Sequence, residues 1–470
     1  MKKIVKLLFL IIFFQNCSFD NKTGIWRDQS LEAESVLSNS KKDIGKLNKN
    51  LNIKNLKEAF LDPYKIEKGE VIQPSIKISI DPEVENRNWT KIYFNGQNNL
   101  SNYFYTNKRK LAFKSSKLAK FPKNSFSALN DSLTPLIYED HIISYDQRGN
   151  IYVYSIDQKK KIYEFNFYKN KYKRYKKTIY LTVQDGVIYA SDNLGYMYSI
   201  DINSNKLKWA KNYGIPFRSN AQIVDNQLII SNQDNTLFSI QLNTGAKNWE
   251  YQTQMTNLKT NFINNIAVDE INKNILFVNT SGELYSVNYL TKKVNWILYL
   301  KKLSPSTETD LFSSLPIIIK ENNLMLSTNK SISLFNTATG FKVWERFIVS
   351  KTKPILTQNY LFLITSDHYL MCIDLLSGET VWSQNLYKQV DKEKKLEKTM
   401  KKIGAATNII IANSKIIVIT NNGHVLLFNY FDGKIYSKDR ILKSKISSIP
   451  VVSKGSIYFF DGSFRLRKYN

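Results

Sequence analysis

The stretch "CIDLLSGETVW", residues 372–382, joins two strand-like runs through a turn at Ser377-Gly378. Similar stretches recur along the chain, and each one ends on an aromatic residue. These terminal aromatics are Phe165, Trp209, Trp249, Trp296, Trp344, Trp382 and Tyr436. Successive members are separated by between 38 residues (Trp344 to Trp382) and 54 residues (Trp382 to Tyr436). Such a period is typical of a four-stranded propeller blade and not of a catalytic motif.

One repeat, residues 219–252, indicates how a blade is built. Its strand-like runs are residues 221–224, 227–231, 236–241 and 246–251. Between these runs lie Asp225-Asn226, residues 233–235 and Asn243-Thr244-Gly245, which supply the conformations that tight hairpins need. The repeat therefore predicts four antiparallel strands joined by hairpins, and several such sheets arranged radially form a propeller.

The repeats predict an all-β, eight-bladed propeller. Seven blades are expected near residues 133–170, 177–213, 216–255, 262–300, 313–350, 352–388 and 405–441. The last segment, residues 447–470, supplies only three strands and would leave one sheet edge open. We expect residues 109–118 to supply the missing outer strand, with Phe113 in the position of the terminal aromatic. The ring would then close by pairing the two ends of the propeller chain.

The terminal aromatics are expected to hold neighbouring blades together. Each lies on the outermost strand of its blade and should pack flat against the next blade. A Trp side chain buries about 150–250 Å². Truncation of one of these residues to Ala should therefore cost about 3–5 kcal/mol.

The N-terminus resembles a targeting signal. Lys2, Lys3 and Lys6 accompany the apolar run "LLFLIIFF", which is too short to span a bilayer as a helix, and Cys17 follows. The arrangement is similar to a bacterial lipoprotein signal, with residues 1–16 removed and Cys17 carrying the lipid. The alternative is an ordinary secretory signal with an incidental cysteine. In the lipoprotein interpretation, Ser18 indicates sorting to the outer membrane.

Residues 17–86 are polar, and we interpret them as a lipidated tether that is mostly disordered or weakly helical. Residues 87–470 form the predicted propeller. The other cysteine, Cys372, lies in an alternating strand pattern and is expected to be a small buried hydrophobe.

The chain is strongly basic, with 67 Lys+Arg against 40 Asp+Glu and a net charge of +27. Such a balance indicates either an anionic partner surface or a compositional bias in which Lys, Asn, Ile and Tyr are enriched together. The basic residues are scattered through every repeat without a recognition helix, so no nucleic-acid partner is predicted.

No catalytic residue, metal site, cofactor or small-molecule substrate is predicted. His141, His368 and His424 fall at hairpins of different blades and lack metal-ligand spacing. No G-x-S-x-G motif occurs. Asp157, Asp201 and Asp374 recur in register at the ends of third strands, which indicates turn formers.

The Asp-x-x-x-Gly-x-x-x-Trp pattern of residues 374–382 resembles the pyrroloquinoline-quinone-type repeat. Eight such blades behind a lipoprotein signal resemble the BamB-type lipoproteins of the outer-membrane β-barrel assembly machinery, over about residues 105–470. The resemblance implies a non-catalytic scaffold on the periplasmic face of the outer membrane. It also implies that loops between blades bind the POTRA domains of the barrel protein BamA.

The corresponding loops are "QTQMTNLKTNFINN", residues 252–265, and "KKLSPSTETDLFSS", residues 301–314. Leu258 stands where the family has an exposed Leu, but the Arg that follows it there has no counterpart. Asp310 is the one acidic residue corresponding to the family's pair of Asp residues before a proline, and its offset differs.

Two alternatives stay open. One is another periplasmic scaffold with the same repeat, contacting peptidoglycan or lipopolysaccharide. The other is a quinoprotein dehydrogenase, a class that resembles this chain in its repeat. That class carries adjacent cysteines and a calcium-binding set, which this sequence lacks.

Overall fold

The computed structural model describes residues 17–20, 25–28, 71–72, 78–108, 110–118, 134–168, 172–255, 262–301, 311–390 and 395–470. The chain divides into two compact units, residues 1–65 and 66–470. In the first unit, β1 (Cys17–Asp20) and β2 (Ile25–Asp28) form an antiparallel hairpin, which the sequence did not predict. The helix-forming potential within residues 29–65 lies outside the described residues.

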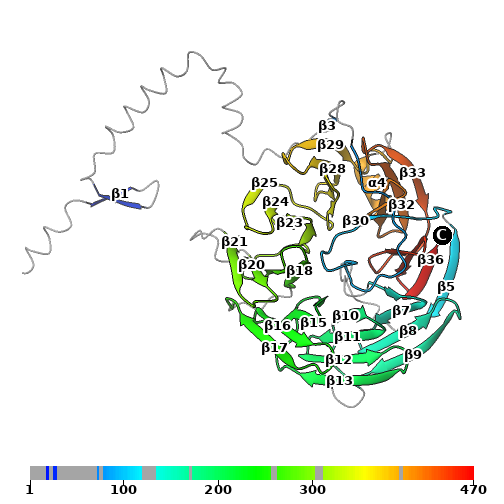
Figure 1. Cartoon of the computed structure of the whole chain (residues 1–470). Coiled ribbons are helices and arrows are strands. Elements are labelled where there is room, and N and C mark those ends of the chain that lie inside the picture. The colour runs from blue at the N-terminus through cyan, green and yellow to red at the C-terminus, as the bar shows by residue number, and fades with distance from the viewer. Residues whose placement is uncertain are drawn as a thin grey trace, which may run out of the picture. The chain divides into compact units, whose positions relative to one another are not determined.

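The second unit confirms the predicted eight-bladed propeller (Figure 1). In each blade the first strand lies nearest the centre and the fourth at the rim. Blades 1 to 4 consist of β6 (Leu136–Tyr138), β7 (His141–Tyr145), β8 (Asn150–Ser155) and β9 (Lys160–Asn166); β10 (Ile179–Gln184), β11 (Val187–Asp192), β12 (Tyr196–Asp201) and β13 (Lys206–Asn212); β14 (Gln222–Val224), β15 (Gln227–Ser231), β16 (Thr236–Gln241) and β17 (Lys247–Gln252); and β18 (Asn265–Asp269), β19 (Asn274–Val278), β20 (Glu283–Asn288) and β21 (Val294–Tyr299).

Blades 5 to 7 follow the same order. They consist of β22 (Ile318–Lys320), β23 (Asn323–Ser327), β24 (Ile332–Asn336) and β25 (Lys342–Arg346); β26 (Ile355–Leu356), β27 (Tyr360–Ile364), β28 (Tyr369–Asp374) and β29 (Thr380–Asn385); and β30 (Ala406–Ala412), β31 (Lys415–Thr420), β32 (His424–Asn429) and β33 (Ile435–Arg440). A helix, α4 (Leu396–Ile403), lies in the connection between blades 6 and 7. This helix is too short to cross a bilayer. Among the described residues, no helix is both long enough and apolar enough to do so.

Two further short strands extend blades 6 and 7. β3 (Val71–Ile72) pairs with the outer edge of β29, and β4 (Asn102–Tyr103) pairs in parallel with the inner edge of β30.

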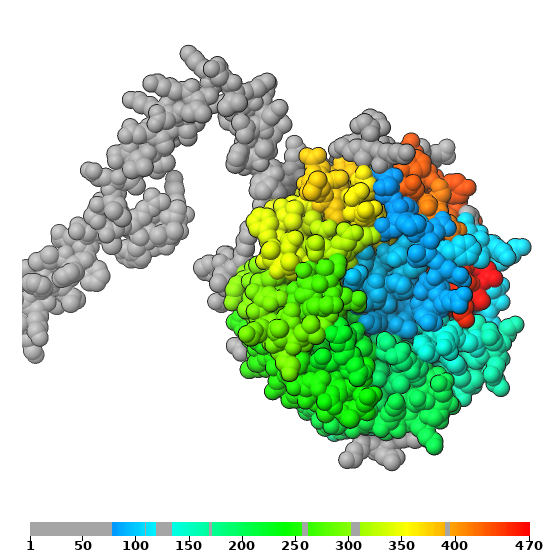
Figure 2. Space-filling view, in the orientation of Figure 1, coloured from blue at the N-terminus to red at the C-terminus, as the bar shows by residue number. Residues whose placement is uncertain are grey.

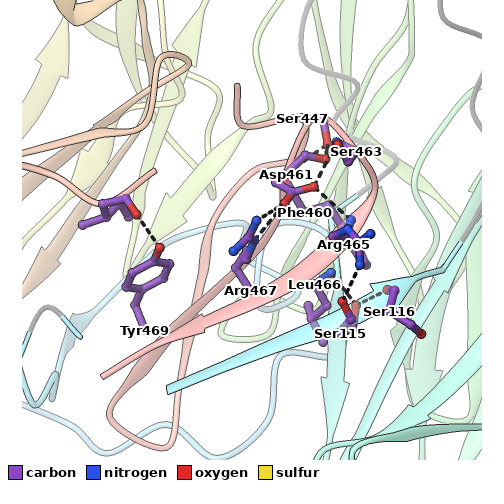
Figure 3. Close-up of polar contacts among 11 residues, drawn as sticks. Ser115, Ser116, Ser447, Phe460, Asp461, Ser463, Arg465, Leu466, Arg467 and Tyr469 are labelled. Atoms are coloured by element: carbon purple, nitrogen blue, oxygen red, sulfur yellow. Dashed lines mark hydrogen bonds and ion pairs between the residues drawn. The ribbon is translucent and has the colours of Figure 1, made fainter. Parts of the chain in front are cut away.

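Blade 8 closes the ring as predicted. It consists of β34 (Val451–Ser453), β35 (Ser456–Phe460), β36 (Arg465–Tyr469) and the N-terminal strand β5 (Leu111–Lys117), which pairs antiparallel with β36. Phe113 faces Lys468 across this pairing. Figure 3 shows polar contacts of β36: the Ser115 hydroxyl of β5 accepts the Leu466 N–H at 2.9 Å, and Arg467 contacts the buried carboxylate of Asp461, in the turn before β36, at 2.6 Å.

The sequence determines the strands through residue type and turn chemistry. The second and third strands of each blade are buried on both faces, because each sheet is sandwiched between two others, and they are rich in β-branched and aromatic residues. First-to-second turns such as Asp185-Gly186 and Asp225-Asn226 have positive φ at both central residues, as type I′ hairpins require. Seven blades also share a register shift at the same place between the third and fourth strands, so this bulge belongs to the repeat.

Candidate partner-binding face

Strand direction gives the propeller two different faces. The first-to-second and third-to-fourth turns lie at one face, which we call the turn face. The second-to-third turns and the loops that join successive blades lie at the other, which we call the loop face. The two loops implied as partner-binding sites belong to the loop face. Leu258 and Asp310 themselves lie outside the described residues.

The chain leaving blade 3 is fixed by hydrogen bonds to neighbouring turns. The Thr253 hydroxyl donates to the Asn235 carbonyl at 2.7 Å and accepts from the Asn279 amide at 2.9 Å. The Gln254 carbonyl accepts from the Asn235 amide at 3.0 Å and from the Ser281 hydroxyl at 2.9 Å. Both blades 3 and 4 therefore hold the start of this loop.

The chain entering blade 4 is fixed in the same way by Asn264, which is buried. Its backbone N–H donates to the Arg218 carbonyl at 2.7 Å, and its side-chain amide donates to Ser231 Oγ at 2.9 Å and to the Asn232 carbonyl at 3.0 Å. Both ends of the loop are thus anchored on second-to-third turns.

The ends of the loop between blades 4 and 5 are also anchored. The Leu300 N–H donates to the Gly282 carbonyl at 2.8 Å. At the other end, the Asn265 amide donates to Ser314 Oγ at 2.9 Å, and the Asn329 amide donates to the Leu311 carbonyl at 3.2 Å.

Large apolar side chains are exposed at the ends of both loops. Met255 is 59% exposed and Phe262 is 39% exposed at the two ends of the first loop. Tyr299, which ends β21, is 75% exposed, and Leu311 is 42% exposed at the end of the second loop. Exposed apolar groups gathered on a rigid base are characteristic of a protein interaction surface.

At the turn face, residues 84–106, which we call the central segment, cross the end of the channel (Figure 1). Figure 2 shows this segment, in blue, in the middle of the face that is viewed. It contacts the innermost strand of every blade. In chain order these contacts are Trp89–Ile137, Thr90–Val183, Asn98–Gln222, Gly96–Val268, Gln97–Ile319, Asn99–Leu356, Asn102–Ile411 and Asn86–Val452.

The central segment supplies hydrogen-bond partners for backbone groups on the inner edges of the first strands. The inner edge of each first strand faces the channel, and an unpaired edge is costly when it is shielded from water. The Trp89 and Ile137 backbones exchange two hydrogen bonds of 2.7 and 2.8 Å, and Val268 and Ile319 donate to carbonyls of the segment at 2.8 and 3.0 Å. The sequence did not predict this role. The one signal was the density of Asn and aromatic residues in "WTKIYFNGQNNLSNYFY", residues 89–105.

Asn98 of the central segment forms a polar group with Gln222 and Lys353. The Asn98 amide donates to the Ile266 and Ile317 carbonyls at 2.9 and 3.0 Å and accepts from the Gln222 amide at 3.0 Å. The Lys353 ammonium donates to the Asn98 carbonyl at 2.8 Å. Burial lowers the pKa of Lys353 to about 7, because little water solvates its charge there.

The other residues considered for chemistry are separate from one another. His424 is buried and its ring contacts the Ile403 carbonyl, while the His368 ring lies edge-on to Tyr387. Within the described ranges, no group of three or more His, Cys, Asp and Glu has a metal-binding arrangement. Cys372 is fully buried, and burial raises its thiol pKa. Asp374 accepts hydrogen bonds from the Ser377 N–H and hydroxyl and so forms its turn.

The eight terminal aromatics all lie in the fourth strand of their blades. Four of the Trp rings lie against a glycine in the third-to-fourth turn of the next blade. The pairs are Trp209–Gly245, Trp296–Gly340, Trp344–Gly378 and Trp382–Gly433. In each pair the indole N–H also donates to a backbone carbonyl of that turn, which is Leu242, Ala338, Leu375 or Tyr430.

Tyr436 is the exception in burial, with 61% of its surface exposed. The outer strand of the next blade comes from the N-terminal β5, so blade 8 has no third-to-fourth turn to cover Tyr436. Instead, the Lys415 ammonium lies 4.8 Å from the centre of its ring.

Comparison with known proteins places these features in a family. The family model described as "Outer membrane protein assembly factor BamB" matches residues 147–384, which are 238 of the 470 residues. The outer membrane protein assembly factor BamB of Moranella endobia is 20% identical over 315 residues, covering 62% of this chain and 74% of that protein.

Two solved structures show the same fold. BamB from Moraxella catarrhalis superposes with a TM-score of 0.58 at 16% identity, covering 76% of this chain and 99% of that chain. A europium-containing methanol dehydrogenase superposes with a TM-score of 0.56 at 11% identity, covering 80% of this chain and 90% of that chain. BamB and a dehydrogenase therefore share this fold, and likeness to these structures shows the fold alone. By the match to the family model, the chain belongs to the family of the outer membrane protein assembly factor BamB.

Proposed function

We propose that the protein is a non-catalytic scaffold of outer-membrane β-barrel assembly and that its loop face binds the POTRA region of a BamA-like barrel protein. The observation that carries the proposal is the set of exposed apolar side chains Met255, Phe262, Tyr299 and Leu311 at the ends of two anchored loops. Family membership supports the same role.

The anchored loop ends favour binding for an energetic reason. Ordering a segment on association costs conformational entropy, and a base that is already fixed by hydrogen bonds lowers this cost. Asn264, for example, is 1% exposed, and its side chain already donates to Ser231 at the end of β15 and to Asn232 in the turn that follows. The apolar groups on this base would supply the desolvated centre of an interface, which usually carries most of the affinity.

The membrane attachment belongs to the same proposal. Cys17 would carry a lipid at the periplasmic face of the outer membrane, and residues 18–70, which precede the first strand paired with a blade, would give the propeller its reach. A flexible chain of this length has a root-mean-square span of roughly 35–45 Å. The Cys17→Ser variant should leave the membrane fraction for the soluble fraction on cell fractionation, and a variant that stays in the membrane would contradict the anchor.

The central segment favours a scaffold function over the enzymatic function of other proteins with this fold. Residues 84–106 fill the turn-face end of the channel and bond to the inner strands of all eight blades. That end is therefore built as a packed structural centre. The active surface in the proposal is the opposite, loop face.

The proposal is tested by calorimetric titration of the full chain, purified in detergent, with the POTRA region of BamA from the same cell. Met255→Asp and Leu311→Asp each place a charge in the proposed interface and should weaken binding at least about tenfold, or about 1.4 kcal/mol. Leu376→Asp is the matched control, because Leu376 is 86% exposed but lies in a third-to-fourth turn at the other face. Equal affinities for all three variants, or no binding by the wild type, would overturn the proposal.

A further inference from the structure

One terminal Trp residue, Trp249, does not make the contact with a turn glycine that the other four terminal Trp residues make. The four intact pairs place a Trp ring against a turn glycine whose φ lies between +65° and +74°. At the corresponding position opposite Trp249, blade 4 has Lys292 instead of glycine. Lys292 keeps the same turn: its φ is +63°, and its N–H donates to the Asn288 carbonyl at 2.7 Å.

The side chain of Lys292 prevents the close approach. A Cβ atom built on Gly245 would lie 2.6 Å from the Trp209 ring, and Lys292 carries a real Cβ at the equivalent place. The Trp249 ring therefore cannot take the docked position. Its indole nitrogen is buried, and among the described residues it has no hydrogen-bond partner, unlike those of the four docked rings.

A cavity of about 510 Å³ lies where this contact is missing. It is lined by Trp249 and Lys292 together with turn residues of blade 3, including Asn226, Gln241 and Asn243. A second cavity of about 420 Å³ shares Asp225, Asn226 and Leu242 with the first. Both volumes are in the usual range of sites for small ligands, about 300–1,000 Å³.

The lining has the chemistry that recognises a carbohydrate. The side-chain amides of Asn226 and Asn243 are exposed and make no hydrogen bond with any described residue. An amide offers a donor and an acceptor together, as does each hydroxyl of a sugar, so the two groups pair in both directions. The ring of Trp249 offers an apolar surface, which suits the C–H face of a pyranose ring.

Charge and polarity make other small ligands less suitable. The carboxylates of Asp225 and Glu270 line the two cavities and oppose an anion, while the ammonium of Lys292 opposes a cation. The amide-rich lining leaves an apolar ligand without compensation for the desolvated polar groups.

We propose that the cleft between the turns of blades 3 and 4, with Trp249 at its base, is a saccharide-binding site. It lies at the turn face, so a bound glycan and a protein partner at the loop face can be held at the same time. The proposal does not depend on the proposed function, because neither the residues nor the face are shared. In the cell envelope a saccharide can come from peptidoglycan, whose sugars are N-acetylated, or from other hexose-containing glycans.

The test is calorimetric titration of the full chain with chitotriose, an N-acetylated probe, and with maltotriose, a probe without acetamido groups. The wild type should bind at least one probe saturably at millimolar concentration. Lys292→Gly restores the glycine of the intact pairs, so Trp249 should dock and the cleft should close. This variant should bind the probe at least about tenfold more weakly while melting at a temperature no lower than the wild type.

Two further variants keep the result interpretable. Asn205→Gly is the matched control, because Asn205 has φ +56° in the corresponding turn of blade 2 and lines neither cavity. It should bind like the wild type. Asn243→Ala removes one exposed amide without affecting the core and should weaken binding severalfold. No saturable binding of either probe by the wild type, or binding that persists in both Lys292→Gly and Asn243→Ala, would overturn the proposal.

Discussion

At the scale of single residues, the blades are joined by contacts between a tryptophan and a glycine. In the Trp344–Gly378 pair the indole N–H donates to the Leu375 carbonyl at 2.9 Å while the ring covers the glycine Cα. The glycine is needed for two separate reasons. Its φ of +73° disfavours any side chain, and a Cβ would lie 2.8 Å from Cδ2 of Trp344.

The two reasons can be separated by a pair of variants. Gly378→Ala introduces both the backbone strain and the clash, and it should lower the free energy of unfolding by about 2–4 kcal/mol. Gly214→Ala is the matched control: its φ is +82°, but no atom lies within 4 Å of the added Cβ, so only about 1–2 kcal/mol should be lost. Urea denaturation measures both, and equal losses would show that the ring contact contributes nothing.

The buried amine of Lys353 gives the stability a pH dependence. Its pKa is lowered by burial from 10.5 to about 7 in the folded chain. Between these two values the unfolded chain holds a proton on this amine that the folded chain has released, so the free energy of unfolding rises with pH. Below about pH 7 both states are protonated and the contribution no longer changes.

Lys353→Met keeps most of the side-chain volume and removes the titration. The wild type should gain stability between about pH 7 and about pH 9 relative to this variant, as measured by urea denaturation across that range. Parallel pH profiles for the two proteins would contradict the buried position of the amine.

At the scale of elements, the ring depends on one pairing between distant parts of the chain. β5 and β36 form the outer half of blade 8, and the contacts of Ser115 in Figure 3 join them. Ser115 is central to this pairing: it is 2% exposed, its hydroxyl accepts from the Leu466 N–H, and its carbonyl accepts from Arg465 at 3.3 Å. Propeller closure therefore rests partly on a small polar residue inside an otherwise exposed strand.

The neighbouring serine provides a direct comparison. Ser115→Ala leaves the buried Leu466 N–H without its acceptor and should cost about 1–3 kcal/mol of unfolding free energy. Ser116 is exposed on the same strand, and Ser116→Ala should change stability by no more than about 0.5 kcal/mol. If thermal melting gave the two variants the same midpoint, the Ser115 contact would not support closure.

At the scale of the whole molecule, features carried by every repeat were predictable and features that occur once were not. The strand runs predicted for blade 3 differ from the observed strands by at most one residue at each end, because hairpin chemistry recurs at Asp225-Asn226 and Asn243-Thr244-Gly245. Closure by Phe113 and its neighbours was predictable because a three-stranded last blade requires a partner.

The central segment could not be predicted for a physical reason. It contributes one or two residues to each blade, so its sequence has no strand periodicity, and its Asn side chains act as substitutes for backbone pairing. The candidate site was predictable only as two loop positions. The anchoring residues Asn235, Asn264 and Asn279 have the composition of ordinary turn residues, and their role follows only from the turns that they join.

The central claim, that the loop face binds a barrel-assembly partner, is tested most directly by site-specific photo-cross-linking in living cells. A photoreactive residue is placed at Met255 or Leu311 of the full-length protein, and at Leu376 as the control on the turn face, and cross-linked products are identified by mass spectrometry. We expect cross-links from positions 255 and 311 to POTRA peptides of BamA, and none from position 376. Capture of BamA from position 376 alone, or its absence from the products of 255 and 311, would contradict partner binding at the loop face.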